Sequence, residues 1–218
     1  MAVPTPVDLL FPPRCIICQK LLPLRSVICP ECARALSPTG SQARQHGEFY
    51  DACFSPFFYE EPLRIAFLRY KFNGRKQYAP IFAKWMADCL RGQEKLPAFD
   101  FVTWAPLSPL RYWKRGYDQA GLLAENVAKQ LGLPVQATLK KAYRRPLSQL
   151  SGERSARMAQ ILDAYSIRSR ADVKGKSILL IDDITTSGAT LSECARVLKT
   201  AGAAQVYCLT LARKHSDS

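Results

Sequence analysis

Residues 178–190, ILLIDDITTSGAT, carry the strongest structural signal in the chain. An aliphatic run typical of a buried strand ends in two adjacent carboxylates, Asp182 and Asp183, and a short hydroxyl-rich loop then leads into a helical pattern. Successive backbone N–H groups beside a helix N-terminus form an anion-binding nest, which the helix dipole strengthens. Gly188 lets the backbone approach an anion closely. The stretch predicts a phosphate site at the carboxyl end of a central strand of an open α/β sheet.

The two carboxylates restrict the class of ligand further, because they would repel an anion that offers no other group. They fit a ligand that also offers the paired hydroxyls of a ribose, or a bound Mg²⁺. A sugar with a terminal phosphate meets both demands. The stretch has neither the lysine of a P-loop nor the spaced glycines of a dinucleotide-binding turn, so ATP and NAD are disfavoured. The alternative is a buried strand followed by a threonine-capped helix, which leaves the paired carboxylates and dense hydroxyls without a packing reason.

Strand and helix patterns alternate on the N-terminal side of this stretch and continue after it. Strand patterns occupy residues 50–59, 100–107, 176–183 and 205–212, and helical patterns occupy 63–72, 78–90, 120–132 and 191–203. A polar segment at 37–48 is typical of a loop. The alternation predicts an α/β fold with a central, mostly parallel sheet flanked by helices.

Four of the eight cysteines form two C-x-x-C pairs separated by ten residues: Cys15, Cys18, Cys29 and Cys32. Two such turns can place four thiolates on a tetrahedron around one Zn²⁺. Full ligation by sulfur leaves no open coordination position, so the metal would be structural. The alternatives are a pair of redox dithiols or a chance cluster.

The composition limits the cellular setting and the class of partner. The chain has 31 Lys and Arg against 18 Asp and Glu, and a net charge of +13 favours polyanionic partners. The aliphatic runs are far shorter than the roughly 20 residues of a membrane span. The N-terminus is rich in proline and has no basic leader, so we expect a cytoplasmic protein without a signal peptide or membrane span.

Residues 178–190 resemble the ribose-phosphate signature of type I phosphoribosyltransferases. Together with RYWKRGYDQAGLLA at 111–124, the two C-x-x-C pairs and LTLAR at 209–213, they resemble the ComF family of bacterial competence proteins over residues 9–213. The resemblance implies a type I phosphoribosyltransferase-like α/β domain, expected at 41–218, after a small N-terminal zinc ribbon, expected at 1–40. It also implies a role in the uptake and processing of transforming DNA.

The same resemblance implies specific residue roles. Asp182 and Asp183 would be the catalytic carboxylates, holding the ribose hydroxyls of phosphoribosyl pyrophosphate, with Mg²⁺ on its phosphates. The residues expected around the 5-phosphate are Thr185, Thr186, Ser187, Gly188, Ala189 and Thr190. Residues 105–115 would supply a pyrophosphate loop, and residues 144–154 would form a flexible lid.

Residues 111–157 hold ten basic and three acidic side chains, +7 of the net +13. Guanidinium groups bind pyrophosphate oxygens in pairs and stabilise negative charge on a leaving group. The candidates for this role are Arg111, Arg115, Arg144 and Arg145. Aromatic residues interleave with the charges, a combination suited to single-stranded nucleic acid. The candidates for strand contact are Tyr112, Trp113, Lys114, Lys140, Lys141 and Arg154. The alternatives are packed aromatic side chains and a solvated basic surface.

Three functional hypotheses follow. The first is a phosphoribosyltransferase-like protein that binds phosphoribosyl pyrophosphate and single-stranded DNA during DNA uptake, with DNA-uptake or recombination proteins as further partners. The second is an active phosphoribosyltransferase in nucleotide salvage or metabolism. The third is a non-catalytic adaptor whose zinc ribbon docks another protein. The intact carboxylates and hydroxyl-rich loop favour the first two, and the acceptor of a phosphoribosyl group stays open.

Overall fold

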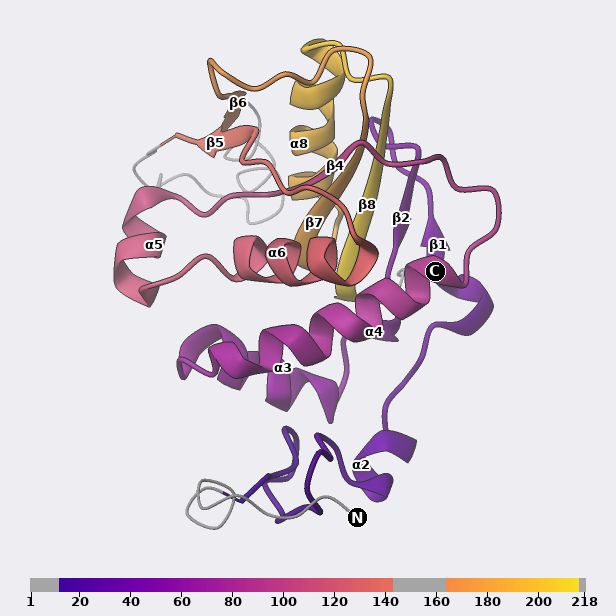
Figure 1. Ribbon diagram of the computed structural model, residues 1–218, viewed down its shortest axis with the longest axis vertical. Helices are drawn as coiled ribbons and strands as arrows, with labels where there is room; N and C mark the ends of the chain where they lie inside the picture. Colours follow the sequence, from indigo (N-terminus) through magenta and orange to yellow (C-terminus); the bar gives the residue numbers. More distant parts are fainter. Residues whose placement is uncertain (1–11, 143–163, 216–218) are drawn as a thin grey trace, which may run out of the picture.

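The computed structural model of the chain describes residues 12–142 and 164–215. Its main sheet has six strands: β1 (Arg44–Gln45), β2 (Ala52–Phe54), β3 (Phe57–Phe58), β4 (Phe101–Trp104), β7 (Ser177–Thr185) and β8 (Gln205–Arg213). The order across the sheet is β1-β2-β8-β7-β4, and β3 also pairs with β8. All pairs are parallel except β1 with β2, which confirms the mostly parallel α/β sheet (Figure 1).

Helices cover both faces of this sheet. Alternate strand residues, such as Leu179 and Ile181 of β7, pack with α3 (Leu63–Phe72), α4 (Ala79–Arg91) and α6 (Gln119–Leu131). The residues between them, such as Leu180, pack with α8 (Ala189–Thr200) on the opposite face. A small antiparallel pair, β5 (Leu139–Lys141) with β6 (Tyr165–Ile167), also lies beside α8. The sheet is therefore buried on both faces, as a parallel sheet requires.

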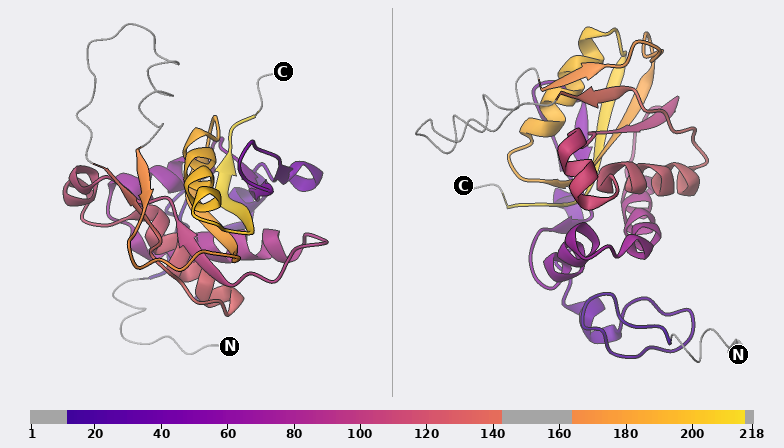
Figure 2. Two further views of the ribbon diagram at one scale, coloured as in Figure 1. Left: turned by 90° about the horizontal axis from the view of Figure 1, so that it is seen from above. Right: turned by 90° about the vertical axis from the view of Figure 1, so that its left-hand side faces the viewer.

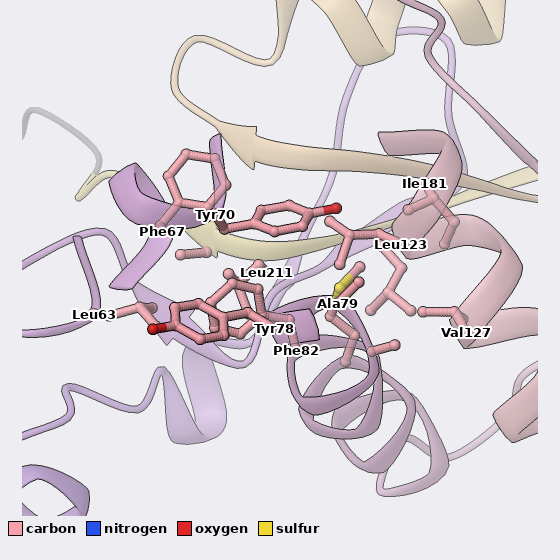
Figure 3. Close-up of a cluster of buried hydrophobic side chains, with 14 of the residues drawn as sticks. Leu63, Phe67, Tyr70, Tyr78, Ala79, Phe82, Leu123, Val127, Ile181 and Leu211 are labelled. Atoms are coloured by element: carbon pink, nitrogen blue, oxygen red, sulfur yellow. The ribbon is translucent and has the colours of Figure 1, made fainter. Parts of the chain in front are cut away.

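Aromatic side chains join α3, α4 and α6 in the core of the first face (Figure 3). Tyr70 of α3 stands edge-on to Phe82 of α4, with ring centroids 5.5 Å apart. The Tyr70 hydroxyl donates to the backbone carbonyl of Gln119, at the start of α6, over 2.8 Å. These contacts fix the C-terminal end of α3 against the first turn of α6.

Several element limits differ from the sequence prediction. The strand predicted at 50–59 is two short strands, β2 and β3, because Pro56 between them has no N–H to donate. The segment predicted as a loop at 37–48 contains a 3-10 turn, η1 (Gly40–Gln42), and strand β1. Helix α5 (Pro109–Arg115), turn η2 (Lys76–Tyr78) and strand β6 were not predicted.

The strand of residues 178–190 is longer than its sequence pattern indicates. It was predicted to end at Asp183, but β7 continues to Thr185, because its register with β8 persists as far as the pair Thr185 and Arg213. Helix α8 then begins at Ala189, two residues earlier than predicted. The connecting loop is therefore only residues 186–188, and Thr185 lies at the end of a strand.

The N-terminal cysteine module lies at one end of the molecule, beyond α3 and α4 (Figures 1 and 2). Its one described helix is α2 (Pro30–Arg34). The guanidinium of Arg69 in α3 donates to the backbone carbonyls of Ile16 and Ile17, and the Gln19 amide donates to the Tyr78 hydroxyl over 3.2 Å. The module is thus docked on the helices that cover the sheet.

Candidate functional site

The four cysteines of the N-terminal module converge. The sulfur atoms of Cys15, Cys18, Cys29 and Cys32 all lie within 4.8 Å of one another, and those of Cys18 and Cys29 are 3.7 Å apart. Sulfurs placed tetrahedrally about 2.3 Å from one Zn²⁺ would be roughly 3.8 Å apart, so the cluster fits that ion. None of the four is in a disulfide. The arrangement supports a structural zinc site with four sulfur ligands.

The paired carboxylates at the end of β7 point to opposite faces of the sheet. Side chains alternate along a strand, and Asp183 continues the series of Leu179 and Ile181, whereas Asp182 continues that of Leu180. Each carboxylate accepts a hydrogen bond from the next backbone N–H, over 2.8 Å from Asp183 and 2.7 Å from Ile184. The two acids thus share one strand end but have different surroundings.

Asp183 faces α3, where its carboxylate forms an ion pair with the Lys71 amine over 2.8 Å. Both side chains are largely buried, with exposed fractions of 15% for Asp183 and 23% for Lys71. Lys71 was not predicted as a site residue, because it lies 112 residues away from Asp183 and resembles an ordinary polar residue of a surface helix. A ribose hydroxyl or a cation that approaches Asp183 must compete with this amine.

Asp182 faces the opposite side, toward Lys141, Tyr165 and Cys194. Burial, followed by repulsion from Asp183, raises the pKa of Asp182 to about 8. The Lys141 amine donates to the Tyr165 hydroxyl over 2.7 Å, and burial, followed by the nearby Arg111, lowers the pKa of Lys141. The structure therefore places Lys141, a candidate for strand contact, on the Asp182 side of β7. Lys140, its neighbour in β5, is exposed.

The loop after β7 has the form expected of an anion nest. Thr186 and Ser187 are exposed, and Gly188 precedes α8 with a φ of 73°, a conformation that favours glycine. Ala189 and Thr190 form the first turn of α8, so their backbone N–H groups belong to its N-terminus. The Thr185 side chain is buried at the strand end, with 7% exposed. The predicted phosphate residues thus form one continuous loop and helix start, in which Thr185 is buried and the others are exposed or half-buried.

Basic side chains from α5 and α3 line a pocket of about 400 Å³ next to Asp183. The lining residues are Lys71, Phe72, Gly74, Arg111, Lys114, Arg115 and Tyr117. Burial lowers the pKa of Arg115, while the nearby Asp183 acts in the opposite direction. Arg111 and Arg115 thus line one pocket with Lys71, the partner of Asp183, and their role in pyrophosphate binding stays a prediction. Arg144, Arg145 and Arg154, and the predicted lid, lie outside the described residues.

The Asp118 carboxylate holds the loop that leads into α5. One oxygen accepts from the Leu107 backbone N–H (3.2 Å) and the Trp104 indole (3.1 Å), and the other accepts from the Gly121 N–H (3.1 Å) and caps α6. Sequence analysis gave Asp118 no role, although an aspartate directly before a helical pattern is a capping signal. This residue positions the predicted pyrophosphate loop.

Comparisons with known proteins match both parts of the chain. The family model of the phosphoribosyl transferase domain matches residues 118–218, and that of the double zinc ribbon domain matches residues 6–62. The chain is 33% identical over 191 residues to competence protein ComFC of Streptococcus pneumoniae, with 85% of this chain and 80% of that relative covered. The chain belongs to the ComF family of competence proteins.

Other relatives agree with this assignment. DNA utilization protein YhgH of Salmonella typhi is 27% identical over 206 residues, covering 89% of this chain and 88% of its own length. Competence protein F of Haemophilus influenzae is 26% identical over 223 residues, covering 92% and 96%. The predicted family, a phosphoribosyltransferase-like α/β fold with a zinc ribbon, is therefore confirmed.

Within residues 12–142 and 164–215, no helix has the length and apolar character needed to cross a bilayer.

The zinc site can be tested by metal content and folding. We expect elemental analysis to find about one zinc per chain, and Cys15→Ser to lose the metal and unfold the N-terminal module, because metal-binding energy is folding energy in so small a unit. Cys89→Ser, which alters a half-buried thiol outside the cluster, serves as the control and should retain the zinc. A folded module in metal-free protein would contradict the assignment.

Because the pKa of Asp182 is raised, we predict that replacement of this side chain stabilises the folded protein in a pH-dependent way. Folding retains a proton that the unfolded chain releases, so this residue costs stability as pH rises from about 4 to about 8. Relative to wild type, Asp182→Asn should therefore gain up to about 4 kcal/mol in unfolding free energy between pH 5 and pH 8, because each pH unit contributes about 1.4 kcal/mol. Urea unfolding between pH 5 and 8.5, without divalent cations, measures it.

Asp88→Asn is the control for this experiment. Asp88 is exposed, and its hydrogen bond with Lys84 lowers its pKa, so its replacement should give no such gain. An Asp182→Asn protein whose stability difference from wild type is constant across the pH range would disprove the raised pKa.

Proposed function

We propose that this ComF-family protein binds phosphoribosyl pyrophosphate at the carboxyl end of β7 and single-stranded DNA on α5, and acts in DNA uptake. The observation that carries the first half is the convergence of an anion nest, two carboxylates and basic side chains at one sheet edge. The family and the named competence and DNA-utilization relatives support the role in DNA uptake.

The nest binds the 5-phosphate of the ligand. Exposed Thr186 and Ser187 offer hydroxyls, and the backbone N–H groups at the start of α8 offer further donors with the positive end of the helix dipole. Thr190 lies within the first turn of the helix and adds a third hydroxyl. These donors suit a phosphate dianion better than a neutral group.

The carboxylates bind the ribose. Its hydroxyls donate to Asp182 and Asp183, and the Lys71 amine, now paired with Asp183 over 2.8 Å, moves toward the pyrophosphate. Carboxylate oxygens are also suitable ligands for Mg²⁺. When present, Mg²⁺ would neutralise part of the phosphate charge, and Asp182 and Asp183 are the residues of this chain that would hold it.

The arginines of α5 bind the pyrophosphate. Arg111 and Arg115 line the pocket beside Asp183, and their guanidinium forks suit pairs of phosphate oxygens. Arg115 is oriented by its hydrogen bond to the Gln119 amide oxygen, 3.0 Å long. In a transfer reaction, these cations would stabilise the negative charge that develops on the departing pyrophosphate.

The outer surface of α5 binds the DNA strand. Trp113 and Tyr112 expose 85% and 54% of their surfaces, and Lys114 is exposed between the aromatic side chains and the pocket. Exposed aromatic rings stack bases while nearby cations follow the phosphate backbone. Lys140 is a further exposed cation, on β5.

Calorimetric titration tests the phosphoribosyl site. Phosphoribosyl pyrophosphate with Mg²⁺ should release measurable heat with wild-type protein and with Asp88→Asn, which alters an exposed carboxylate of α4. The double variant Asp182→Asn and Asp183→Asn should bind at least about tenfold more weakly, because it loses the charged acceptor of Asp183 and replaces one oxygen of each carboxyl group by an amide nitrogen, which cannot accept a hydrogen bond. Indistinguishable titrations would refute the site.

A salt series tests the DNA surface. Binding of a single-stranded oligonucleotide should weaken linearly on a logarithmic salt scale, with a slope of about 0.7 for each phosphate contact. Lys114→Met should reduce the slope by about one contact, and Trp113→Ala should weaken binding by about 1–3 kcal/mol. Lys129→Met, on the exposed surface late in α6, is the charge-matched control. A salt-independent affinity would rule out phosphate contact.

A further inference from the structure

We propose that the part of the pocket between α3 and α5 that lies near Phe72 and Lys114 is a nucleotide site, in which a base lies against Phe72 and its phosphate is bound by Lys114. The site adjoins the phosphoribosyl pyrophosphate site and rests on that proposed function, because it would hold the group that faces the sugar. Its pocket, about 400 Å³, joins residues from the end of α3 to those of α5. Pyrophosphate binding alone does not require the aromatic residues that line this pocket.

The pocket carries more positive charge than a pyrophosphate needs. Its lining contains four cations and, among the described residues, no carboxylate, while Lys71 alone is paired with Asp183. A pyrophosphate that carries Mg²⁺ is close to neutral and would leave most of the remaining charge uncompensated. A second anionic ligand, such as the phosphate of a nucleotide, would compensate it.

The aromatic lining indicates a flat ligand group. Phe72, the last residue of α3, is 61% exposed, which is a large exposure for an apolar side chain. The Arg115 guanidinium lies over its ring at 5.2 Å from the centroid. A base stacked on the free side of this ring would bury apolar surface and retain the cation on the other side.

The size of the pocket agrees with a nucleotide. A volume of about 400 Å³ lies within the range of small-molecule sites, roughly 300–1,000 Å³. A pyrophosphate group alone would fill only part of it. Because Lys71 reaches from this pocket to Asp183 over 2.8 Å, the nucleotide would lie beside the ribose of the neighbouring ligand.

A nucleotide can reach this pocket from two sources. It can be free in solution, or it can be the phosphorylated end of a DNA strand whose following bases contact Trp113 on the outside of α5. Both sources present the same base and phosphate. Closed circular single-stranded DNA has no end and therefore separates them.

The experiment titrates full-length, zinc-loaded protein with 2′-deoxyadenosine 5′-monophosphate, with a 5′-phosphorylated linear oligonucleotide and with circular single-stranded DNA. The first should bind wild-type protein, and Phe72→Ala should weaken its binding at least about fivefold, the lower limit for loss of one stacked base. Phosphoribosyl pyrophosphate binding should change much less than mononucleotide binding in Phe72→Ala, because the ring carries no charge and Arg115, which loses a stacking partner, keeps its hydrogen bond to Gln119. Leu110→Ala, on exposed α5 surface that does not line the pocket, is the control and should bind both ligands normally.

Saturating ribose 5-phosphate distinguishes this pocket from the nest. It fills the nest and the carboxylates only, so the mononucleotide should still bind in its presence. Complete competition, or equal mononucleotide affinity in wild type and Phe72→Ala, would overturn the proposal. A linear strand that binds through Phe72 more tightly than circular DNA supports the strand end as the source, and binding of the mononucleotide alone supports a free nucleotide.

The two proposals fail separately. Loss of the phosphoribosyl site would appear as wild-type protein that binds no phosphoribosyl pyrophosphate, whatever the nucleotide does. Failure of the nucleotide site would appear as normal phosphoribosyl pyrophosphate binding without a Phe72-dependent mononucleotide titration.

Discussion

The two-residue period of β7 is the constraint on which the candidate site depends. It sends Asp183 to the face of α3 and α6, and Asp182 to the face of α8. One acid therefore has a lysine partner, whereas the other is half-buried with a raised pKa. A strand slipped by one residue would exchange these surroundings, so the parallel pairing of β7 with β8 fixes chemistry as well as fold.

Local patterns in the sequence predicted much of this structure. The helix at 63–72 has the predicted limits, and the cysteine spacing predicted a cluster in which four sulfurs converge. The hydroxyl-rich run after Asp183 likewise predicted a tight loop before a helix. Each of these features depends on residues close together in the chain, where spacing and residue type determine the geometry.

Features that depend on distant residues were not predictable in this way. The partner of Asp183 lies on α3, and no spacing relates Lys71 to a strand more than a hundred residues later. Lys141 appeared as one of several basic residues, yet the packing of β5 against β6 brings its amine to the Tyr165 hydroxyl. Strand β7 extends beyond its aliphatic residues because β8 continues to pair with it. The length of β7 therefore depends on the neighbouring strand and not on its own sequence pattern.

Three consecutive residues of α3 make contacts in three directions. Arg69 donates to the carbonyls of the cysteine module, the Tyr70 hydroxyl donates to α6, and the Lys71 amine pairs with the end of β7. Successive helical residues point about 100° apart, so these bonds surround the helix axis. A shift of this part of the helix would therefore strain at least one of these bonds. The cysteine module at the far end of the molecule and the carboxylate of Asp183 at the sheet edge thus both contact a single turn of helix, and any displacement of that turn is shared by both.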